Sequence, residues 1–122
     1  MKYQADHHIT KDQHVWAFAA DMQPVLRVKP GATIHLETWD CFTGQVQSEA
    51  DTVEKLDLNR VNSATGPIFV EGAMPGDSLA VTLKTIDPGP QGAGMVIPEW
   101  GQLIHKSKSP VTRIFKVSDG IV

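Results

Sequence analysis

The sequence predicts a mainly β fold: an antiparallel β-sandwich or barrel-like domain with one short helix. Two residue pairs, Pro30-Gly31 and Pro75-Gly76, each precede a segment in which apolar and polar residues alternate. Proline fixes φ at the second position of a type II turn, and glycine supplies the positive φ needed at the third. Alternation with a period of two is typical of a half-buried strand. Two such units in one chain favour an antiparallel sandwich or barrel.

Composition and charge exclude several classes of protein. The chain has 122 residues, enough for one domain, and we treat residues 1–122 as a single β-rich domain. The net charge is −3 and no run of Lys and Arg occurs, which argues against a nucleic acid partner. No apolar run approaches the length of a membrane span, so we expect no membrane partner. The single cysteine, Cys41, excludes an internal disulfide and fits a reducing cytoplasm.

The N-terminal part of the chain is expected to form a hairpin. Residues 1–13 are polar and indicate a lead-in that holds at most a short strand, and residues 14–18 suit a strand. Residues 24–39 form the predicted hairpin around Pro30-Gly31. In its second strand Ile34 and Leu36 should face the interior, while the opposite face carries Thr33, His35 and Glu37.

A short helix and a second hairpin are expected to follow. Ser48 suits the cap of a helix whose first turn carries Glu49 and Asp51. The residues after Pro75-Gly76 alternate strongly enough to predict a strand. We therefore expect a strand at residues 79–86. A loop is also expected at residues 40–45, and a flexible Gly- and Pro-rich loop at residues 87–94. Residues 111–117 should form a last strand.

The end of the sequence indicates a further hairpin. Ser118-Asp119-Gly120 follows a predicted strand, and Asp-Gly between apolar residues is a strong turn signal. Ile121-Val122 would then begin a returning strand. Because an unpaired strand edge invites association, we expect this chain to belong to a longer one or to pair with a complementary piece.

Four segments occur in an order that points to a known family. They are Pro24-Val-Leu-Arg-Val-Lys-Pro-Gly31, Glu37-Thr-Trp-Asp-Cys-Phe42 with Gly44-Gln45, Asn59-Arg-Val-Asn62, and Thr65-Gly-Pro-Ile-Phe-Val-Glu-Gly-Ala-Met-Pro-Gly-Asp77. With these residues the chain resembles the N-terminal part of the acetamidase/formamidase family, over residues 24–86 and more weakly beyond. The last segment is the most specific, since Pro-Gly-Asp alone is a common turn.

The resemblance implies an amidohydrolase. Members of that family hydrolyse short aliphatic amides, such as formamide and acetamide, to a carboxylate and ammonia. The resemblance also implies a mostly β fold and a homo-oligomer. Family members are more than twice as long, and their later part carries a segment with His and acidic residues that has no counterpart here. We therefore expect this chain to supply only part of a catalytic unit, pairing with a C-terminal half.

Asp40 and Glu71 are the catalytic candidates. Amide hydrolysis needs an activated nucleophile, a stabiliser for the oxyanion and an acid for the departing amine. Each of these carboxylates lies at the end of a predicted strand beside a loop. Either could act as a general base on water or ligate a metal that activates one. The structural alternatives are a loop-capping Asp40 and a solvent-exposed Glu71.

Amide side chains provide the substrate-binding candidates. Gln45, Asn59 and Asn62 could donate hydrogen bonds to the carbonyl oxygen of an amide substrate or orient its nitrogen. Asparagine is also one of the residues most used in turns, so a structural role is the alternative for both asparagines.

The cofactor is left open by the sequence, and a divalent metal ion is one candidate. His14 and His35 could meet across strands and bind it together with Asp40. The neighbouring His7 and His8 should point to opposite faces of an extended strand, which argues against a site made by that pair. Cys41 has no histidine beside it in sequence, so a role as nucleophile is not favoured.

Two functions compete with an amidase. The first is a non-catalytic β-sandwich module that serves interaction or oligomerisation. The second is a copper-binding protein of the cupredoxin kind, which would need two histidines, a cysteine and a weak axial ligand close together. No compact Cys-His-Met group lies near a predicted strand end, so the second is the weaker of the two.

Overall fold

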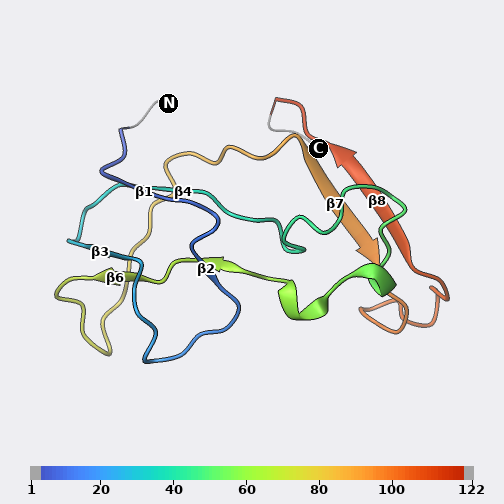
Figure 1. Ribbon diagram of the computed structural model, residues 1–122, viewed down its shortest axis with the longest axis horizontal. Coiled ribbons are helices and arrows are strands. Elements are labelled where there is room, and N and C mark those ends of the chain that lie inside the picture. Colours follow the sequence, from blue (N-terminus) through green and yellow to red (C-terminus); the bar gives the residue numbers. More distant parts are fainter. Residues whose placement is uncertain (1–3, 120–122) are drawn as a thin grey trace.

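The computed structural model describes residues 4–119, and the regular structure of this part consists mainly of short strands (Figure 1). Four two-stranded ribbons are connected by long turns, and they do not merge into one closed sheet. The prediction of a mainly β chain is therefore confirmed, whereas a sandwich or barrel is not. The strands are β1 (His7–Ile9), β2 (His14–Val15), β3 (Leu26–Val28), β4 (Ile34–Leu36), β5 (Ala64–Thr65), β6 (Ile68–Val70), β7 (Gln91–Val96) and β8 (Val111–Lys116).

The first predicted hairpin is wrong, although its turn is confirmed. Gly31 has φ of 90°, and the Ala32 N–H donates to the Lys29 carbonyl oxygen at 3.3 Å, as a type II turn requires. The flanking strands β3 and β4 do not pair with each other. Instead β3 pairs in parallel with β6, and β4 pairs in parallel with β1. The turn residues determine a local reversal of the chain, but they do not determine which strands become partners.

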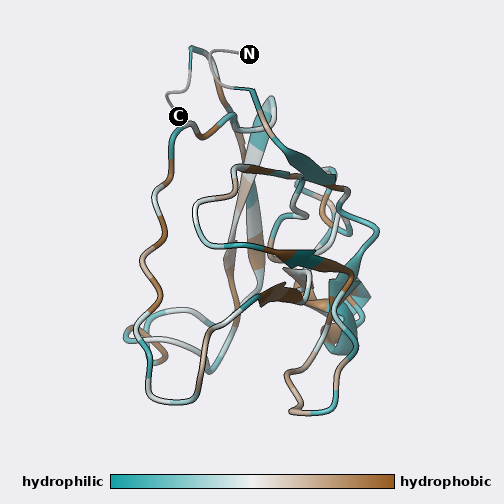
Figure 2. Cartoon of the chain, turned by 90° about the vertical axis from the view of Figure 1, so that its left-hand side faces the viewer, coloured by the Kyte–Doolittle hydropathy of each residue, from teal (hydrophilic) through white to brown (hydrophobic). Residues whose placement is uncertain are grey.

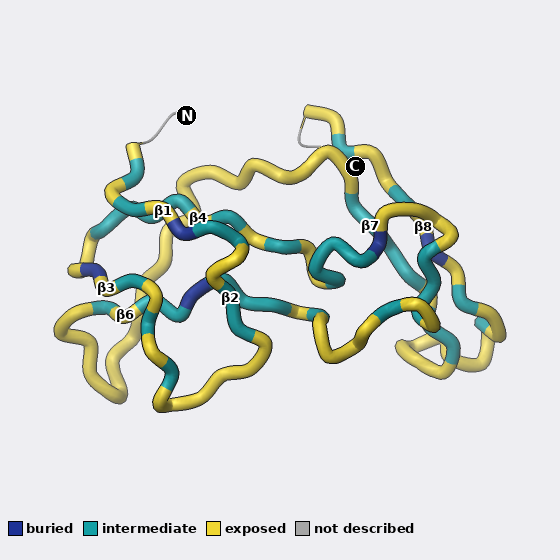
Figure 3. The backbone as a smooth tube through the Cα atoms, in the orientation of Figure 1, coloured by how far each residue is buried: buried dark blue, intermediate teal, exposed yellow. Residues whose placement is uncertain are grey.

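The second Pro-Gly turn is also confirmed, but the strand predicted after it is not. Gly76 has φ of 99°, and the Asp77 N–H donates to the Met74 carbonyl oxygen at 3.0 Å. Residues 79–86 belong to no ladder within the described chain. Every residue from 71 to 91 is exposed (Figure 3). A strand needs a partner edge for its backbone groups, and the described residues provide none for this segment.

The predicted short helix is replaced by tighter turns. Two 3₁₀ turns occupy this region, η1 (Val53–Lys55) and η2 (Leu58–Arg60). Ser48 does not cap a helix, because its own N–H and hydroxyl donate to the Asp51 carboxylate at 2.8 and 3.0 Å. Local side-chain bonds of this kind give the backbone an alternative to helix.

The C-terminal ribbon corrects the prediction of a flexible loop. Residues 91–94 were expected to be part of that loop, but they begin β7, which pairs antiparallel with β8 over six residues. The strand predicted at residues 111–117 is confirmed as β8. A Cβ added at Gly94 would lie 3.1 Å from Cε2 of Phe115, so this glycine accommodates an aromatic ring. The hairpin predicted at residues 118–122 lies largely outside the described residues.

The buried core of the described residues is small. Its buried apolar members are Ile9, Val28 and Val46. The accessible surface is 9667 Å², whereas a folded monomer of 13.3 kDa has roughly 6,450 Å². The chain thus exposes roughly 3,200 Å² more surface than a compact monomer of its mass. Many side chains that a compact domain would bury are therefore exposed.

Much of the exposed apolar surface belongs to the extended segment after the second turn. Leu79, Val81, Leu83 and Ile86 are 68%, 71%, 74% and 75% exposed. Figure 2 shows this extended segment set apart from the strands, with apolar and polar positions alternating along it. Within residues 4–119, no helix has the length and apolar character needed to cross a bilayer.

Candidate functional site

Asp40 follows β4 and holds the loop that begins there. Its Oδ1 accepts a hydrogen bond from the Phe42 N–H at 2.7 Å, and its Oδ2 accepts one from the Gly44 N–H at 3.0 Å. Gly44 has φ of 72°, and a Cβ there would lie 3.0 Å from the Trp39 ring. Both oxygens of this carboxylate are thus engaged in shaping the loop, as in an Asx-type turn.

Gln45 joins this loop to the two 3₁₀ turns. Its amide nitrogen donates to the carbonyl oxygens of Phe42, Asp57 and Arg60 at 3.0, 3.2 and 3.1 Å. Its amide oxygen accepts from the Asp57 N–H at 2.8 Å. Because donor and acceptor are both used within the chain, the side chain fixes the spacing between the two segments.

The two candidate asparagines lie on the other side of this junction. Asn59 donates through its Nδ2 to Asp57 Oδ1 at 3.2 Å, and its backbone N–H contacts the same oxygen at 3.0 Å. Asn62 adopts φ of 56°, and its N–H donates to the Cys41 carbonyl oxygen at 2.7 Å. The structure therefore brings Asn59, Asn62, Gln45 and the Asp40 loop into one neighbourhood.

Glu71 lies elsewhere, directly after β6. Its N–H donates to the Val28 carbonyl oxygen at 2.8 Å, which extends the β3–β6 ladder by one residue. Its side chain is exposed and makes no hydrogen bond or ion pair within residues 4–119. In Figure 1, β4 and β6 run in opposite directions, so the chain leaves them toward opposite ends of the molecule. The described residues thus do not place Glu71 beside the Asp40 loop.

Cys41 lies next to Asp40 and is exposed. Partial burial of its sulfur and then the negative charge of Asp40 raise the pKa of the thiol above its ordinary value. The thiolate is the reactive form of cysteine, and a raised pKa makes it less abundant at neutral pH. The surroundings of Cys41 therefore do not activate it as a nucleophile.

Two buried polar atoms near the same loop lack a partner within the described chain. They are Nε1 of Trp39 and the hydroxyl of Thr43, on either side of Asp40 in sequence. Lys11 Nζ lies 3.9 Å from the centre of the Trp39 ring. Buried polar groups without a partner are uncommon in native folds, so these two atoms mark a part of the loop whose hydrogen bonding is incomplete within the described residues.

The histidines are arranged differently from the prediction. His14 Nδ1 lies 2.8 Å from the Lys11 carbonyl oxygen, and its ring meets Trp16 edge to face. His14 and His35 do not share a metal-ligand group within residues 4–119. The group with such geometry consists instead of His8, His35 and Glu37, whose ligand atoms lie within 4.8 Å of one another.

This group was missed because it depends on which strands pair. The parallel register places His8 opposite His35, and Glu37 follows two residues later on the same face. The sequence places His35 and Glu37 on one face, but it contains no sign that residues 7–9 lie beside residues 34–36. The predicted hairpin between the β3 and β4 segments gave no reason to place β1, and with it His8, beside β4.

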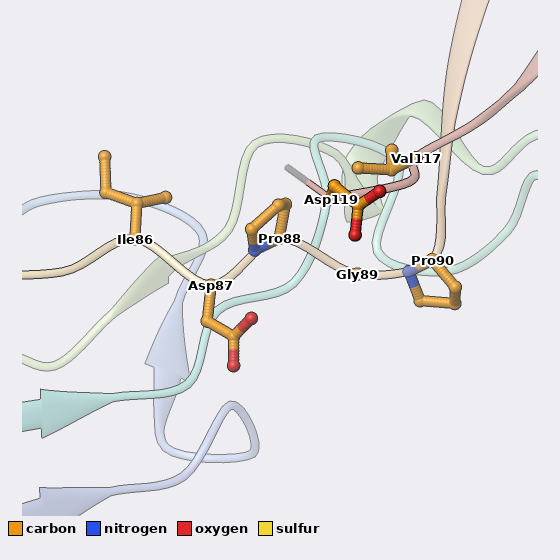
Figure 4. Close-up of a pocket in the computed structure, with 7 residues that line it drawn as sticks. All are labelled: Ile86, Asp87, Pro88, Gly89, Pro90, Val117 and Asp119. Atoms are coloured by element: carbon orange, nitrogen blue, oxygen red, sulfur yellow. The ribbon is translucent and has the colours of Figure 1, made fainter. Parts of the chain in front are cut away.

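A shallow hollow lies where the extended segment reaches β7 (Figure 4). The side chain of Asp87 points away from that of Asp119, so the two carboxylates do not converge on a common point. None of the predicted site residues lines this hollow, which is formed by Ile86, Asp87, Pro88, Gly89, Pro90, Val117 and Asp119.

Comparison with known proteins identifies the class. The model of the Acetamidase/Formamidase family matches residues 3–116, and the chain therefore belongs to that family. An acetamidase of Mycolicibacterium smegmatis is 38% identical over 84 residues, which are 66% of this chain and 21% of that protein. A formamidase of Methylophilus methylotrophus is 38% identical over 68 residues, which are 54% of this chain and 17% of that protein.

Solved structures agree with this assignment. The crystal structure of an acetamidase from Bacillus halodurans superposes with a TM-score of 0.88 at 33% identity, over 91% of this chain and 38% of that one. The crystal structure of a predicted acetamidase/formamidase from Thermoanaerobacter tengcongensis superposes with a TM-score of 0.87 at 38% identity. The match covers 93% of this chain and 38% of that one. The chain thus spans well under half the length of the relatives that it matches.

Proposed function

We propose that this chain forms the N-terminal part of an enzyme that hydrolyses short aliphatic amides to a carboxylate and ammonia. The observation that carries the proposal is the family match over residues 3–116. Relatives named acetamidase and formamidase support this substrate class. The enzyme would be a cytoplasmic homo-oligomer, as the family resemblance and the single cysteine suggest.

The chain is proposed to reach activity only with further polypeptide. Its surface exceeds that of a compact monomer by roughly 3,200 Å², about four times the 800 Å² that one partner buries in a standard interface. The exposed alternating residues of the segment at 79–86 are suited to pair with a strand supplied from outside the described residues. In the solved relatives, 38% of the chain corresponds to this one, so the remaining part is the proposed occupant.

Within this unit, Glu71 and the Asp40 loop are proposed to supply chemistry from two sides. The Glu71 carboxylate has no partner within the described residues and is available to act as a general base. Asp40 holds the loop that carries Gln45 and the unpartnered Trp39 and Thr43 groups. Because the described residues keep these two regions apart, each is proposed to complete a site together with the added polypeptide.

Ammonia release from acetamide and formamide tests the proposal. The chain is assayed alone and after co-expression with the part of the Thermoanaerobacter tengcongensis protein that lies beyond the match. We expect activity only from the combination. Glu71→Gln should lower kcat by about 10²- to 10⁴-fold, as for loss of a general base, whereas Asp12→Asn should leave it unchanged. A folded, associated pair without any amide hydrolysis would instead support a non-catalytic interaction module.

A further inference from the structure

We propose that His8, His35 and Glu37 form a binding site for a divalent transition metal ion such as Zn²⁺. Two imidazoles and one carboxylate are a ligand set that zinc uses in proteins, with a fourth position left for water. The three ligand atoms lie within 4.8 Å of one another. Ligands about 2.1 Å from a tetrahedral zinc are about 3.5 Å apart, so binding needs a closure of about 1 Å.

The backbone fixes the relative positions of the three ligands. Strands β1 and β4 pair in parallel with His8 opposite His35. The Glu37 N–H donates to the Ile9 carbonyl oxygen at 3.0 Å and continues that ladder. The Glu37 carbonyl oxygen accepts from the Thr65 hydroxyl at 2.8 Å, which ties the same residue to β5. A site on paired strands is held more precisely than one on a loop.

The side chains are already oriented toward one another. His8 Nε2 lies 3.1 Å from Glu37 Oε1, and the rings of His8 and His35 meet edge to face at 4.7 Å. The other Glu37 oxygen accepts from the Lys11 N–H at 3.4 Å, which leaves Oε1 toward the histidines. Such outer contacts orient a metal-binding carboxylate. His8 is 52% exposed in its side chain, so it can rotate to complete the site.

The ordinary alternative is a surface ion pair between His8 and Glu37. That pair alone accounts for the 3.1 Å contact, but it does not require His35 on the same face. The neighbouring His7 provides a matched control, because it lies one residue earlier on β1, opposite Ile34. Side chains of successive strand residues point to opposite faces, so His7 cannot join the group.

Calorimetric titration of the chain with ZnCl₂ tests the site without any assay of activity. We expect one ion to bind per chain, with affinity lowered by more than about tenfold in His35→Ala and in Glu37→Gln, and unchanged in His7→Ala. Glu37→Gln preserves the side-chain shape, so it reports on the ligand even if His35→Ala perturbs folding. Visible absorption of bound Co²⁺ should be present in the original chain and lost in Glu37→Gln.

The proposal is overturned if Zn²⁺ binds the Glu37→Gln and His35→Ala chains as tightly as the original. It is also overturned if His7→Ala weakens binding to the same extent, because binding would then be a general property of exposed histidines. The inference does not rest on the proposed amidase activity, since metal binding is measured directly and an inactive enzyme would leave it unaffected.

Discussion

At the scale of single residues, polar side chains in the described chain mostly stabilise the loops that carry them. Asp40, Gln45 and Asp51 each accept hydrogen bonds from backbone N–H groups of their own or a nearby loop. These bonds replace regular structure in a region with few ladders. A substitution that removes one acceptor or donor should therefore lower the free energy of unfolding, and not only the catalytic activity.

Thr112 offers a direct case. It is 3% exposed, and its hydroxyl donates to the Asp51 carbonyl oxygen at 2.7 Å, which ties β8 to the loop before η1. We expect Thr112→Val to lower the free energy of unfolding by about 0.5–1.5 kcal/mol, because the hydrogen bond to the half-buried Asp51 is lost. Urea unfolding measures the change. The exposed Thr85→Val is the control, and equal effects of both substitutions would contradict this role.

Asp51 should make the same region sensitive to acid. Hydrogen bonds from the backbone of Gln47, the backbone of Ser48 and the Ser48 hydroxyl lower its pKa below the ordinary value of 3.8. A lowered pKa in the folded state means that the stabilisation is complete above the unfolded pKa and is lost as the pH falls through the folded one. Thermal unfolding between neutral pH and about pH 2 should show this loss. Asp51→Asn should flatten it, and an unchanged acid profile in that variant would refute the assignment.

At the scale of elements, the β7–β8 ribbon is the longest regular structure in the described residues. Its two glycines, Gly92 and Gly94, lie on one face but meet different surroundings. A Cβ at Gly92 would contact nothing within 4 Å, whereas one at Gly94 would lie 3.1 Å from the Phe115 ring. The ribbon therefore allows two roles of glycine to be compared. At Gly92 only the flexibility of the backbone matters, whereas at Gly94 the missing side chain leaves room for the Phe115 ring.

Alanine at the two positions should have unequal effects. Gly92→Ala removes freedom from the unfolded chain and should stabilise by about 0.4–1 kcal/mol. Gly94→Ala removes the same freedom but requires the Phe115 ring, which is 45% exposed, to shift by a few tenths of an ångström, so it should stabilise less. The measurement is the urea midpoint of each variant. A Gly94→Ala chain as stable as Gly92→Ala would show that the Phe115 ring moves without cost.

Local signals in the sequence predicted turns well and strand partners poorly. Both Pro-Gly turns form as expected, because Pro and Gly determine φ at their own positions. The partner of β4 is β1, some 27 residues away in register, and no local residue encodes that choice. For the same reason the site at His8 could not be foreseen, although the shared face of His35 and Glu37 could. The Asp40 loop was located from its Asp and Gly. Gln45 remains a predicted substrate-binding residue, and the sequence did not reveal that its amide also bridges backbone groups.

At the scale of the whole molecule, exposed apolar surface is the dominant feature. The described residues fold into ribbons with a small core, while residues 71–91 are exposed throughout. Alternating apolar residues are expected to face a core, and their exposure is the basis for the proposal that another polypeptide covers this surface. The proposed cover would account for the short match to longer relatives, for the segment at 79–86, which joins no ladder within the described residues, and for the two buried polar atoms near Asp40.

Hydrogen exchange of residues 79–86 tests this account most directly. In the chain alone, the backbone amides of this segment other than that of Lys84 should exchange at nearly the rate of an unfolded peptide, because no ladder within the described residues includes them. When the complementary part of the Thermoanaerobacter tengcongensis protein is bound, we predict that these amides become among the most protected in the chain. Rapid exchange of this segment in a fully formed complex would contradict the account.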